Sequence, residues 1–501
     1  MDNSILDFNR IPTVLKRCSF ESKMNTSQIY SRKLMIYSGA QGYSFQIPLP
    51  WEIEAFVLYS VYSKEWKYDK ISSKNFWRIM NSIRNYIPPK LEKYKGTTQF
   101  LTWFKITAAS TQFYSQQNYM FLFYRYNYYF SYHNDVIDMN DIFIKKFHHD
   151  HYEYLLMAQS LWLALMAEPE TVFSAIMPLI HDCYRDHISM LAISRSEYIR
   201  QMQNYSGSFE DFLYSFRPSY SYPFIEYENN YYLPTPHLLF QSVCGSMLYR
   251  LTEDNENLRR IIGKEVFESY LLKIIIDSNE FDQALPEHDY EFKREHKKTV
   301  DVMAIKDTII VLLDRKSYVP KSKLRLISEE ALNDDIGRIA KAIAQVYKHT
   351  RNRIGKEYYY FEKNKEYIDF ENDIFGIVII EEDGYLPEEE IYNSAALTLK
   401  LDISETKWLR KHIFVLPLYD LERILFANQS LISFLRKKAE NPDYIIDYPC
   451  YIECEAVDSF RKIFCDEMQK RTWSLVKNVD DKNMLAGFYS KMKSIESRRR
   501  T

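Results

Sequence analysis

Residues 299–317 constrain this chain more than any other stretch, because they place charged groups where a buried strand is predicted. The apolar run Ile309 to Leu313 predicts a buried strand, and Asp314 and Lys316 follow it closely. Side chains alternate along a strand, so these two charges point from the same face. Burial of a carboxylate or an ammonium is costly unless the group is paired or binds a metal. We therefore interpret the segment as a candidate metal site.

Two strands joined by a tight turn are predicted here, and the length of the turn decides whether Asp301 joins the pair. We consider a loop of two residues, 306–307, or of four, 305–308. Either loop sets Asp301 opposite Leu312 and diagonal to Asp314 on one face. A three-residue loop would turn Asp301 to the other face, because a slip of one residue reverses every side chain. The metal-site prediction therefore depends on the register of the hairpin.

The segments around the hairpin predict further helices and strands. One helix opens at Gly263 to Glu268, before the hairpin, and another covers Asp334 to Arg353 after it. The second helix carries the polar sequence Gln345-Val346-Tyr347-Lys348. Two apolar runs, Phe375 to Ile380 and His412 to Leu418, predict further strands. The predicted order is helix, strand hairpin, helix, strand, helix and strand.

Asp301, followed thirteen residues later by Asp314-Arg315-Lys316, resembles the motif of the PD-(D/E)xK, or restriction-endonuclease-like, nuclease superfamily. The acidic first helix, the order of the elements and the polar Gln-x-x-Gln/Lys signature of that family are similar as well. The resemblance covers roughly 180 of the 501 residues. The sequence departs from the family pattern at Val300, where the motif has a proline.

The resemblance implies an α/β, restriction-endonuclease-like core, in which a mixed central sheet is flanked by helices. This core is expected at residues 251–430, between a mostly helical, aromatic-rich recognition or regulatory domain at 1–250 and a helical segment at 431–501. The boundary is predicted near the polar stretch 252–255, a candidate helix cap. Residues 121–132 contain eight aromatics in twelve. For these we favour packing inside a helical domain over the stacking of exposed bases.

The resemblance also implies the roles of the site residues. The predicted metal ligands are Asp301, Asp314 and Glu268, and the predicted catalytic residues are these three with Lys316. Mg²⁺ (or Mn²⁺) held by carboxylates neutralises charge on the phosphate and supplies hydroxide near neutral pH. Lys316 would orient or deprotonate the attacking water. The predicted substrate-binding residues are Gln345, Lys348 and Arg351.

Each of these features has a simpler interpretation that the sequence leaves open. The hairpin can be an exposed edge with solvated charges. Glu268 can form a surface ion pair with Lys264, four residues earlier on the same helix face. Gln345 and Lys348 can belong to a solvated helix face. The stretch Gly337 to Lys356, with six Lys or Arg and no acid, suits phosphate binding or a solvated face equally well.

Composition indicates an intracellular enzyme of more than one domain. The chain has 501 residues, a net charge of −3 and only 11 Gly, and it lacks a Gly-rich phosphate loop, which argues against ATP or NAD dependence. Met1 to Asp7 lack the basic and apolar regions of a signal peptide. The apolar stretch Leu155 to Ala167 is too short to span a bilayer. We expect a cytoplasmic protein with no membrane partner.

A second candidate site is a group of histidines, five of the eleven in the chain, between residues 148 and 187. The five are His148, His149, His151, His181 and His187. The pairs His149-Asp150 and His181-Asp182 resemble those of HD-type metal phosphohydrolases. That arrangement also needs a lone His and a distant Asp, and the sequence offers no convincing candidate for the Asp. The six cysteines make no zinc pattern.

The function predicted from the sequence is a metal-dependent nuclease that hydrolyses phosphodiester bonds of nucleic acid, with DNA favoured over tRNA or other RNA. A nuclease joined to a large second domain resembles the effectors of bacterial anti-phage defence, in which the second domain responds to a regulatory protein or a phage-derived trigger. The alternative is a non-catalytic module that binds nucleic acid or protein and retains the nuclease fold. A lesser alternative is an HD-type phosphohydrolase that uses the His148 to His187 cluster.

Overall fold

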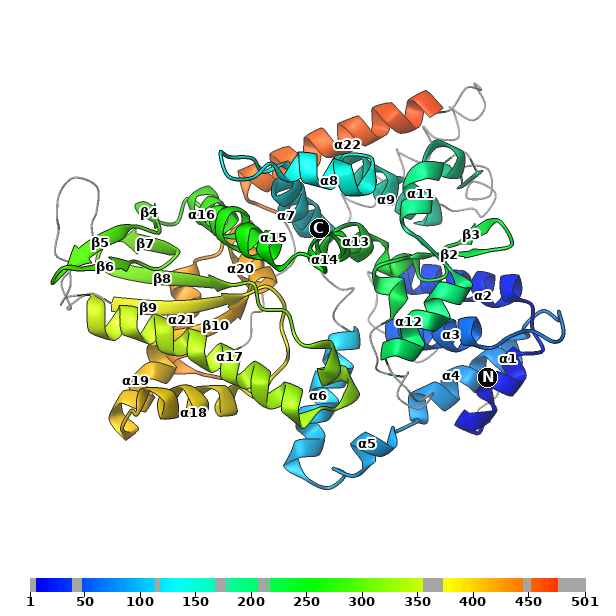
Figure 1. Ribbon diagram of the computed structural model, residues 1–501, viewed down its shortest axis with the longest axis horizontal. Helices are drawn as coiled ribbons and strands as arrows, with labels where there is room; N and C mark the ends of the chain where they lie inside the picture. Colours follow the sequence, from blue (N-terminus) through cyan, green and yellow to red (C-terminus); the bar gives the residue numbers. More distant parts are fainter. Residues whose placement is uncertain are drawn as a thin grey trace.

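The computed structural model describes residues 6–37, 47–112, 118–166, 177–178, 180–205, 213, 217–354, 373–444 and 452–475. They form a mixed α/β fold in which helices predominate, with sheets of five, three and two strands (Figure 1). The predicted C-terminal segment 431–501 contains two described helices, α21 (Leu431–Glu440) and α22 (Glu455–Leu475). Residues 476–501 lie outside the described part, as does Lys356 at the end of the basic stretch.

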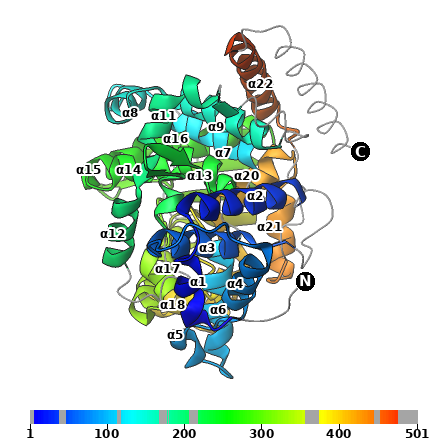
Figure 2. The same ribbon diagram turned by 90° about the vertical axis from the view of Figure 1, so that its right-hand side faces the viewer.

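The N-terminal helices pack around a core of their own. Helix α3 (Pro50–Tyr62) is buried along nearly its whole length and contacts α2 (Phe20–Tyr37), α4 (Ser73–Asn85) and α12 (Arg195–Tyr205). Figure 2 shows α2, α3 and α4 side by side. The three-stranded sheet borders this core. Its strands are β1 (Ala192–Ser194), β2 (Phe224–Tyr227) and β3 (Asn230–Tyr232). The other α-helices described in the first 112 residues are α1 (Ile11–Leu15), α5 (Pro89–Glu92) and α6 (Thr98–Gln112).

Helix α7 (Tyr119–Ser131) carries the aromatic run and lies inside the largest apolar core. Phe121, Phe123 and Tyr129 are fully buried, which confirms packing rather than base stacking as the reason for these rings. Helix α7 contacts α9, α13, α16 and α22. The helices around it are α8 (Met139–Phe147), α9 (His151–Met166), α11 (Arg185–Met190), α13 (Leu239–Val243), α14 (Gly245–Thr252), α16 (Glu268–Asp277) and α20 (Leu418–Phe426).

The five-stranded sheet has the strand order β10-β9-β8-β7-β4. Strands β4, β7 and β8 are antiparallel neighbours, whereas β8, β9 and β10 run parallel. Both apolar runs predicted as strands after the hairpin are present, as β9 and β10. A separate hairpin of β5 and β6, which the sequence had not indicated, is inserted between β4 and β7. The bounds are β4 (Gln283–Pro286), β5 (Asp289–Phe292), β6 (Glu295–Lys298), β7 (Val302–Lys306), β8 (Ile309–Lys316), β9 (Asp373–Ile380) and β10 (Ile413–Pro417).

Helices cover both faces of this sheet (Figure 1). Helix α17 (Glu329–Tyr347) contacts β8, β9 and β10, with α18 (Glu388–Leu399) packed on α17 and α19 (Ile403–His412) on β9 and β10. Helix α16 contacts β4 and β7, and α20 contacts β10. A Cβ added at Gly376 of β9 would lie 2.4 Å from Cγ1 of Val346 in α17. The absence of a side chain at this glycine therefore permits the close approach of α17 to the sheet.

The hairpin of β7 and β8 has a different register from the predicted one. Its two-residue loop is 307–308 instead of 306–307. Asp307 adopts a left-handed backbone conformation with φ of 51°, which tight hairpin turns require and Asp tolerates. Continued by one residue, this register sets Asp301 directly opposite Asp314 rather than diagonal to it. A shift of two residues keeps every side chain on its predicted face, so the two aspartates still share one face.

The helices before and after the hairpin begin earlier than predicted. Asn255 accepts a hydrogen bond from the N–H of Leu258 at 2.9 Å, which confirms a helix cap within 252–255. From there α15 (Glu256–Ile261), a π-helical turn (Ile262–Phe267) and α16 follow without a break, so the helix does not open at Gly263. Helix α17 begins at Glu329 instead of Asp334, because Ser328 caps it, and a π-helical turn (Lys348–Arg353) continues it.

The predicted boundary between residues 1–250 and 251–430 falls within α14, and apolar packing crosses it. The largest core joins side chains of α7 and α9 to those of α16, β8 and α20. A second core packs α6 against α17 and α18. The N-terminal half is therefore in contact with both helical layers around the five-stranded sheet.

Candidate active site

The end of β8 carries two charged side chains on one face. Oδ2 of Asp314 lies 2.6 Å from Nζ of Lys316, and the two side chains are 2% and 34% exposed. The apolar residues before Asp314 are buried in the sheet, which is why the carboxylate is drawn out of water. Burial raises the pKa of Asp314, and the Lys316 ammonium opposes the shift. The ammonium remains partly accessible, while the carboxylate is not.

Asp301 joins this pair from the neighbouring strand. Its Oδ2 accepts a hydrogen bond from the backbone N–H of Arg315 at 2.5 Å. Burial, followed by repulsion from Asp314 and Glu268, raises the pKa of Asp301, and the hydrogen bond from Arg315 acts in the opposite direction. Three acidic side chains are therefore close enough to affect one another's protonation.

Glu268 approaches the same cluster from α16, directly after the π-helical turn. Burial and repulsion from Glu287 raise the pKa of Glu268 to about 7. The predicted attraction to Lys264 is present, but burial and Glu287 outweigh it. Irregular helical turns of this kind occur often at functional sites. Glu268 therefore belongs electrostatically to the cluster rather than to the solvated surface of the helix.

Glu287 is a fourth acid that the sequence did not single out. It follows β4 directly, and Pro286 pairs with Val302, the neighbour of Asp301. Nζ of Lys298 lies 2.5 Å from its carboxylate. Its charge raises the pKa of both Glu268 and Asp314. The short strand Gln283–Pro286 shows no clear alternation of apolar and polar residues. The local sequence therefore does not predict the strand pairing that brings Glu287 to the cluster.

Gln345 of α17 reaches the cluster from above the sheet. Its Nε2 donates to Oδ1 of Asp314 at 3.4 Å, and its Oε1 accepts from Nζ of Lys316 at 3.2 Å. The other two predicted substrate-binding residues are not part of this group. Lys348 is exposed after the end of α17. Arg351 donates to Oε1 of Glu405 at 2.8 Å and lies over the ring of Trp408, so its guanidinium is already engaged.

Arg315, between the two charged residues of β8, points to the opposite face of the sheet. Its guanidinium donates to the carbonyl of Phe267 at 2.6 Å and also to Tyr129 and Glu381. Tyr129 belongs to α7, and Phe267 immediately precedes Glu268. Side chains alternate between the two faces of the sheet along β8. Asp314 and Lys316 therefore belong to the carboxylate cluster on one face, and Arg315 contacts the aromatic helix α7 on the other.

The carboxylate oxygens of the cluster are spread rather than tightly grouped. In the described part of the chain, a single group of three ligand atoms within 4.8 Å of one another is found, and it consists of His149, Glu153 and His187. The oxygens of Glu268, Asp301 and Asp314 do not form such a group. A spread set of carboxylates suits a cation that keeps part of its water shell, as Mg²⁺ does.

The histidines predicted as an HD-type site do not assemble in that way. His149 and His187 come together, but their acidic partner is Glu153. Asp150 accepts a hydrogen bond from the N–H of Glu153 at 2.9 Å at the start of α9. Asp182 forms an exposed ion pair with Arg185. The other three histidines of the predicted cluster lie elsewhere. His151 is buried against the carbonyl of Val243, His148 is exposed at the end of α8, and His181 lines a separate cavity.

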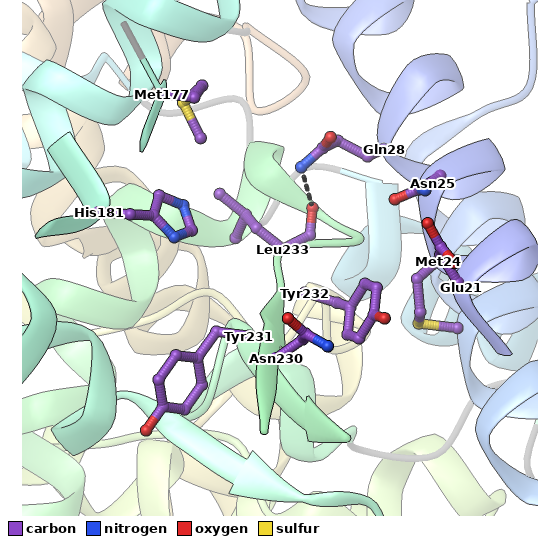
Figure 3. A pocket seen from close by; sticks show the side chains of 10 residues that line it. All are labelled: Glu21, Met24, Asn25, Gln28, Met177, His181, Asn230, Tyr231, Tyr232 and Leu233. Atoms are coloured by element: carbon purple, nitrogen blue, oxygen red, sulfur yellow. Dashed lines mark hydrogen bonds between the residues drawn. The ribbon is translucent and has the colours of Figure 1, made fainter. Parts of the chain in front are cut away.

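A cavity of about 370 Å³ lies away from the carboxylate cluster, between α2 and the hairpin of β2 and β3. Figure 3 shows His181 facing into it, with Gln28 donating to the carbonyl of Leu233 at 3.1 Å. Its walls mix polar and apolar side chains, and Glu21 is the single carboxylate among the residues that line it. It therefore offers no chemistry comparable to that of the cluster.

Comparison with known proteins finds no matching family model, no matching curated protein and no matching solved structure. Among the described helices, none has the length and apolar character needed to cross a membrane. The arrangement of the side chains is therefore the basis on which we infer the function.

Proposed function

We propose that this chain is a metal-dependent nuclease that hydrolyses phosphodiester bonds of DNA or RNA. The observation that carries the proposal is that Asp301, directly before β7, lies close to Asp314 of β8, with Lys316 two residues further along the same face. Glu268 adds a third carboxylate from α16. Hydrolysis of a phosphodiester requires groups that bind a divalent cation and a group that handles the proton of water, and this cluster contains both kinds.

The order of the elements supports a restriction-endonuclease-like core for the same chain. An acidic helix, an antiparallel hairpin, a second helix and a parallel strand occur in this order as α16, β7 with β8, α17 and β9, with β4, β5 and β6 between α16 and β7. The motif that resembles the nuclease superfamily, Asp301 with Asp314-Arg315-Lys316, lies at one end of that hairpin. Position in the fold and motif therefore support the same assignment.

The cluster fits Mg²⁺ or Mn²⁺. Burial and repulsion from neighbouring carboxylates raise the pKa values of Glu268, Asp301 and Asp314, so a divalent cation would relieve an unfavourable arrangement. When bound there, such an ion neutralises charge on a phosphate oxygen and lowers the pKa of its water ligands. Glu268, Asp301 and Asp314 are the residues that would hold it.

Lys316 and Gln345 have different roles in this proposal. The partly exposed ammonium of Lys316 can reach a water or a phosphate oxygen beside the carboxylates, where it orients the nucleophile and stabilises developing negative charge. Gln345 is a positioning residue, because its amide contacts both Asp314 and Lys316. In the absence of substrate, the amide of Gln345 keeps the ammonium of Lys316 beside Asp314.

A non-catalytic binding module that retains the fold is the alternative. Such a module would not need buried acids that repel one another. Replacing these acids with neutral residues would leave its binding affinity unchanged and would stabilise the folded state. Retention of all three groups, Asp301, Asp314 and Lys316, favours the nuclease.

The proposal is tested by incubating the full chain with plasmid DNA and with total RNA, in Mg²⁺, in Mn²⁺ and in EDTA. The matched control is the Asp301→Asn variant, purified in parallel, because it exposes any contaminating nuclease. Binding of Mn²⁺ by both proteins, followed by calorimetry, tests the metal site even if cleavage needs a trigger. Equal Mn²⁺ binding by the wild type and by Asp301→Asn, or cleavage by Asp301→Asn at the rate of an active wild type, would exclude the site.

A further inference from the structure

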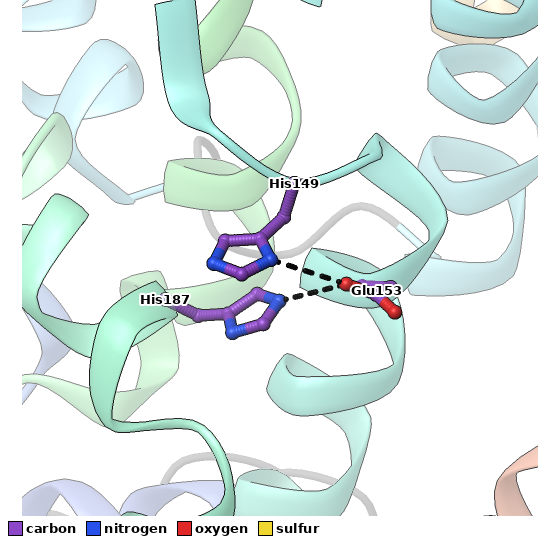
Figure 4. A group of neighbouring side chains, drawn as sticks. All are labelled: His149, Glu153 and His187. Carbon is purple, nitrogen blue, oxygen red and sulfur yellow. Dashed lines mark hydrogen bonds and ion pairs between the residues drawn. The ribbon is translucent and has the colours of Figure 1, made fainter. Parts of the chain in front are cut away.

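The described residues hold a second group of metal-ligand side chains, remote in sequence from the carboxylate cluster. Nδ1 of His149 lies 3.4 Å from Oε2 of Glu153, and Nε2 of His187 lies 3.2 Å from the same oxygen. One ligand atom from each residue falls within 4.8 Å of the other two. Figure 4 shows both imidazole rings turned towards the carboxylate at the start of α9.

These separations match the geometry of a tetrahedral metal site. Zinc binds imidazole nitrogen and carboxylate oxygen at about 2.0–2.1 Å, so neighbouring ligand atoms in a tetrahedron are roughly 3.3 Å apart. The two separations of 3.4 Å and 3.2 Å agree with that value. Binding by all three atoms would require the two rings to rotate out of their stacked arrangement, because an imidazole nitrogen binds a metal in the plane of its ring.

We propose that His149, Glu153 and His187 bind a divalent transition metal ion, with Zn²⁺ the best match and water as the fourth ligand. Two imidazoles and one carboxylate are a donor set typical of zinc sites. Mg²⁺ prefers oxygen ligands and octahedral geometry, so it does not suit this set. The ion is therefore chemically distinct from the one proposed for the carboxylate cluster, and the proposal does not depend on nuclease activity.

The three ligands come from different parts of the local fold. His149 lies between α8 and α9, Glu153 is in the first turn of α9, and His187 comes from α11. The two imidazole rings are stacked, with centroids 3.7 Å apart and planes 21° from parallel. In this stacked arrangement one nitrogen of each ring lies beside Oε2 of Glu153.

An outer contact orients the carboxylate. Nη1 of Arg471, in α22, donates to Oε1 of Glu153 at 3.3 Å, which leaves Oε2 facing the two rings. Residues that orient a metal ligand in this way are a usual part of such sites. The ion would connect the start of α9 with α11 directly and with α22 through Arg471. Its binding would therefore stabilise the helical layer that surrounds α7.

The proposal is tested with Co²⁺ and Zn²⁺ on the full chain, in millimolar Mg²⁺ so that the carboxylate cluster is occupied. Co²⁺ in a tetrahedral site with nitrogen ligands absorbs visible light strongly, whereas six-coordinate Co²⁺ does not, and Zn²⁺ displaces it. The ligand variants are His149→Gln and Glu153→Gln, whose side chains are 28% and 30% exposed in the wild type and whose replacement leaves the buried His187 in place. The matched control is His148→Asn, an exposed neighbour in a left-handed conformation that asparagine accepts.

We expect one tetrahedral Co²⁺ per chain in the wild type and in His148→Asn, and a loss of affinity for Zn²⁺ of more than about tenfold in both ligand variants. Zn²⁺ should also raise the thermal midpoint of the wild type and of the control, but not that of the ligand variants. A wild-type protein without the tetrahedral spectrum, or ligand variants that bind Zn²⁺ as tightly as the control, would overturn the proposal. Either result would leave the nuclease proposal untouched, because the carboxylate cluster shares no residue with this site.

Discussion

The carboxylate of Asp301 accepts a hydrogen bond from the backbone N–H of Arg315 at 2.5 Å. This hydrogen bond joins the side chain of Asp301, directly before β7, to the backbone of β8 at the residue between Asp314 and Lys316. The first acid is therefore held in position by the same strand that carries the second acid and the lysine. The relative placement of the three groups depends on the hairpin itself and needs no loop to close over it.

Replacement of Asp314 by Asn, or of Lys316 by Ala, is expected to lower cleavage by about 100-fold or more. The first change removes a proposed metal ligand and the second removes the group proposed to orient water. Cleavage is measured with each purified variant in Mg²⁺. The control is Lys341→Ala, an exposed lysine four residues before Gln345, which should cleave at the wild-type rate.

The stability of Asp314→Asn distinguishes a metal site from an ordinary ion pair. In metal-free protein the substitution removes repulsion within the cluster, so the thermal midpoint should stay unchanged or rise slightly. Loss of an ordinary buried ion pair would instead destabilise the fold by about 3–5 kcal/mol. Mg²⁺ should raise the midpoint of the wild type but not of the variant. A variant that is inactive only because it unfolds would return Asp314 to a structural role.

The stability of the metal-free protein should fall as the pH rises from about 4 to about 7. Glu268, whose pKa is raised to about 7, binds its proton more tightly in the folded than in the unfolded chain. Its contribution is therefore complete below the unfolded pKa and is lost as the pH passes through the folded pKa. Asp301 acts in the same direction, because its pKa is also raised.

Thermal midpoints measured in EDTA across this pH range test the expectation. Glu268→Gln should flatten the profile, and so should addition of Mg²⁺ to the wild type. Glu253→Gln, at an exposed position before the helix, should keep the wild-type slope. A Glu268→Gln profile parallel to that of the wild type would show that Glu268 titrates alike in the folded and unfolded chain.

Lys348 and Arg351 should respond differently to substitution, although the sequence predicts the same role for both. Lys348 is exposed, so Lys348→Glu should weaken nucleic-acid binding and reduce the slope of log affinity against log salt by about 1 or more. Arg351 is paired with Glu405, so Arg351→Gln should lower the thermal midpoint slightly and leave the slope unchanged. Binding titrations at several salt concentrations measure both slopes. An unaltered slope for Lys348→Glu would assign it to the solvated helix face.

Two glycines near the site should respond to alanine with opposite signs. Gly376→Ala should destabilise the fold by about 1–3 kcal/mol, because its Cβ would lie 2.4 Å from Val346 and 3.1 Å from Thr350. Gly337→Ala, in the interior of α17 with open space at the Cβ position, should stabilise it by about 0.5–1 kcal/mol. Chemical denaturation measures both changes. If Gly376→Ala did not lower the free energy of unfolding, α17 would be able to shift away from the sheet without destabilising the fold.

The sequence alone determined the features that depend on the periodicity of the backbone. Asp314 and Lys316 share a face because strand side chains alternate, and the apolar run before them predicted their burial. Asn255 caps a helix because its side chain can accept from a nearby N–H, which is a local preference. Six of the eight rings in residues 121–132 are buried, because a helix this apolar has few other stable environments.

Tertiary structure decided which of these segments meet. The left-handed conformation of Asp307 moved the turn by one residue, and the pairing of β7 with β8 moved by two, so Asp301 came opposite Asp314. Glu287 joined the acids through the pairing of β4 with β7, and His149, which precedes α9, met His187 of α11 through the stacking of their rings. Contacts between distant segments are selected by burial summed over the whole chain. A local pattern of residues therefore cannot specify them.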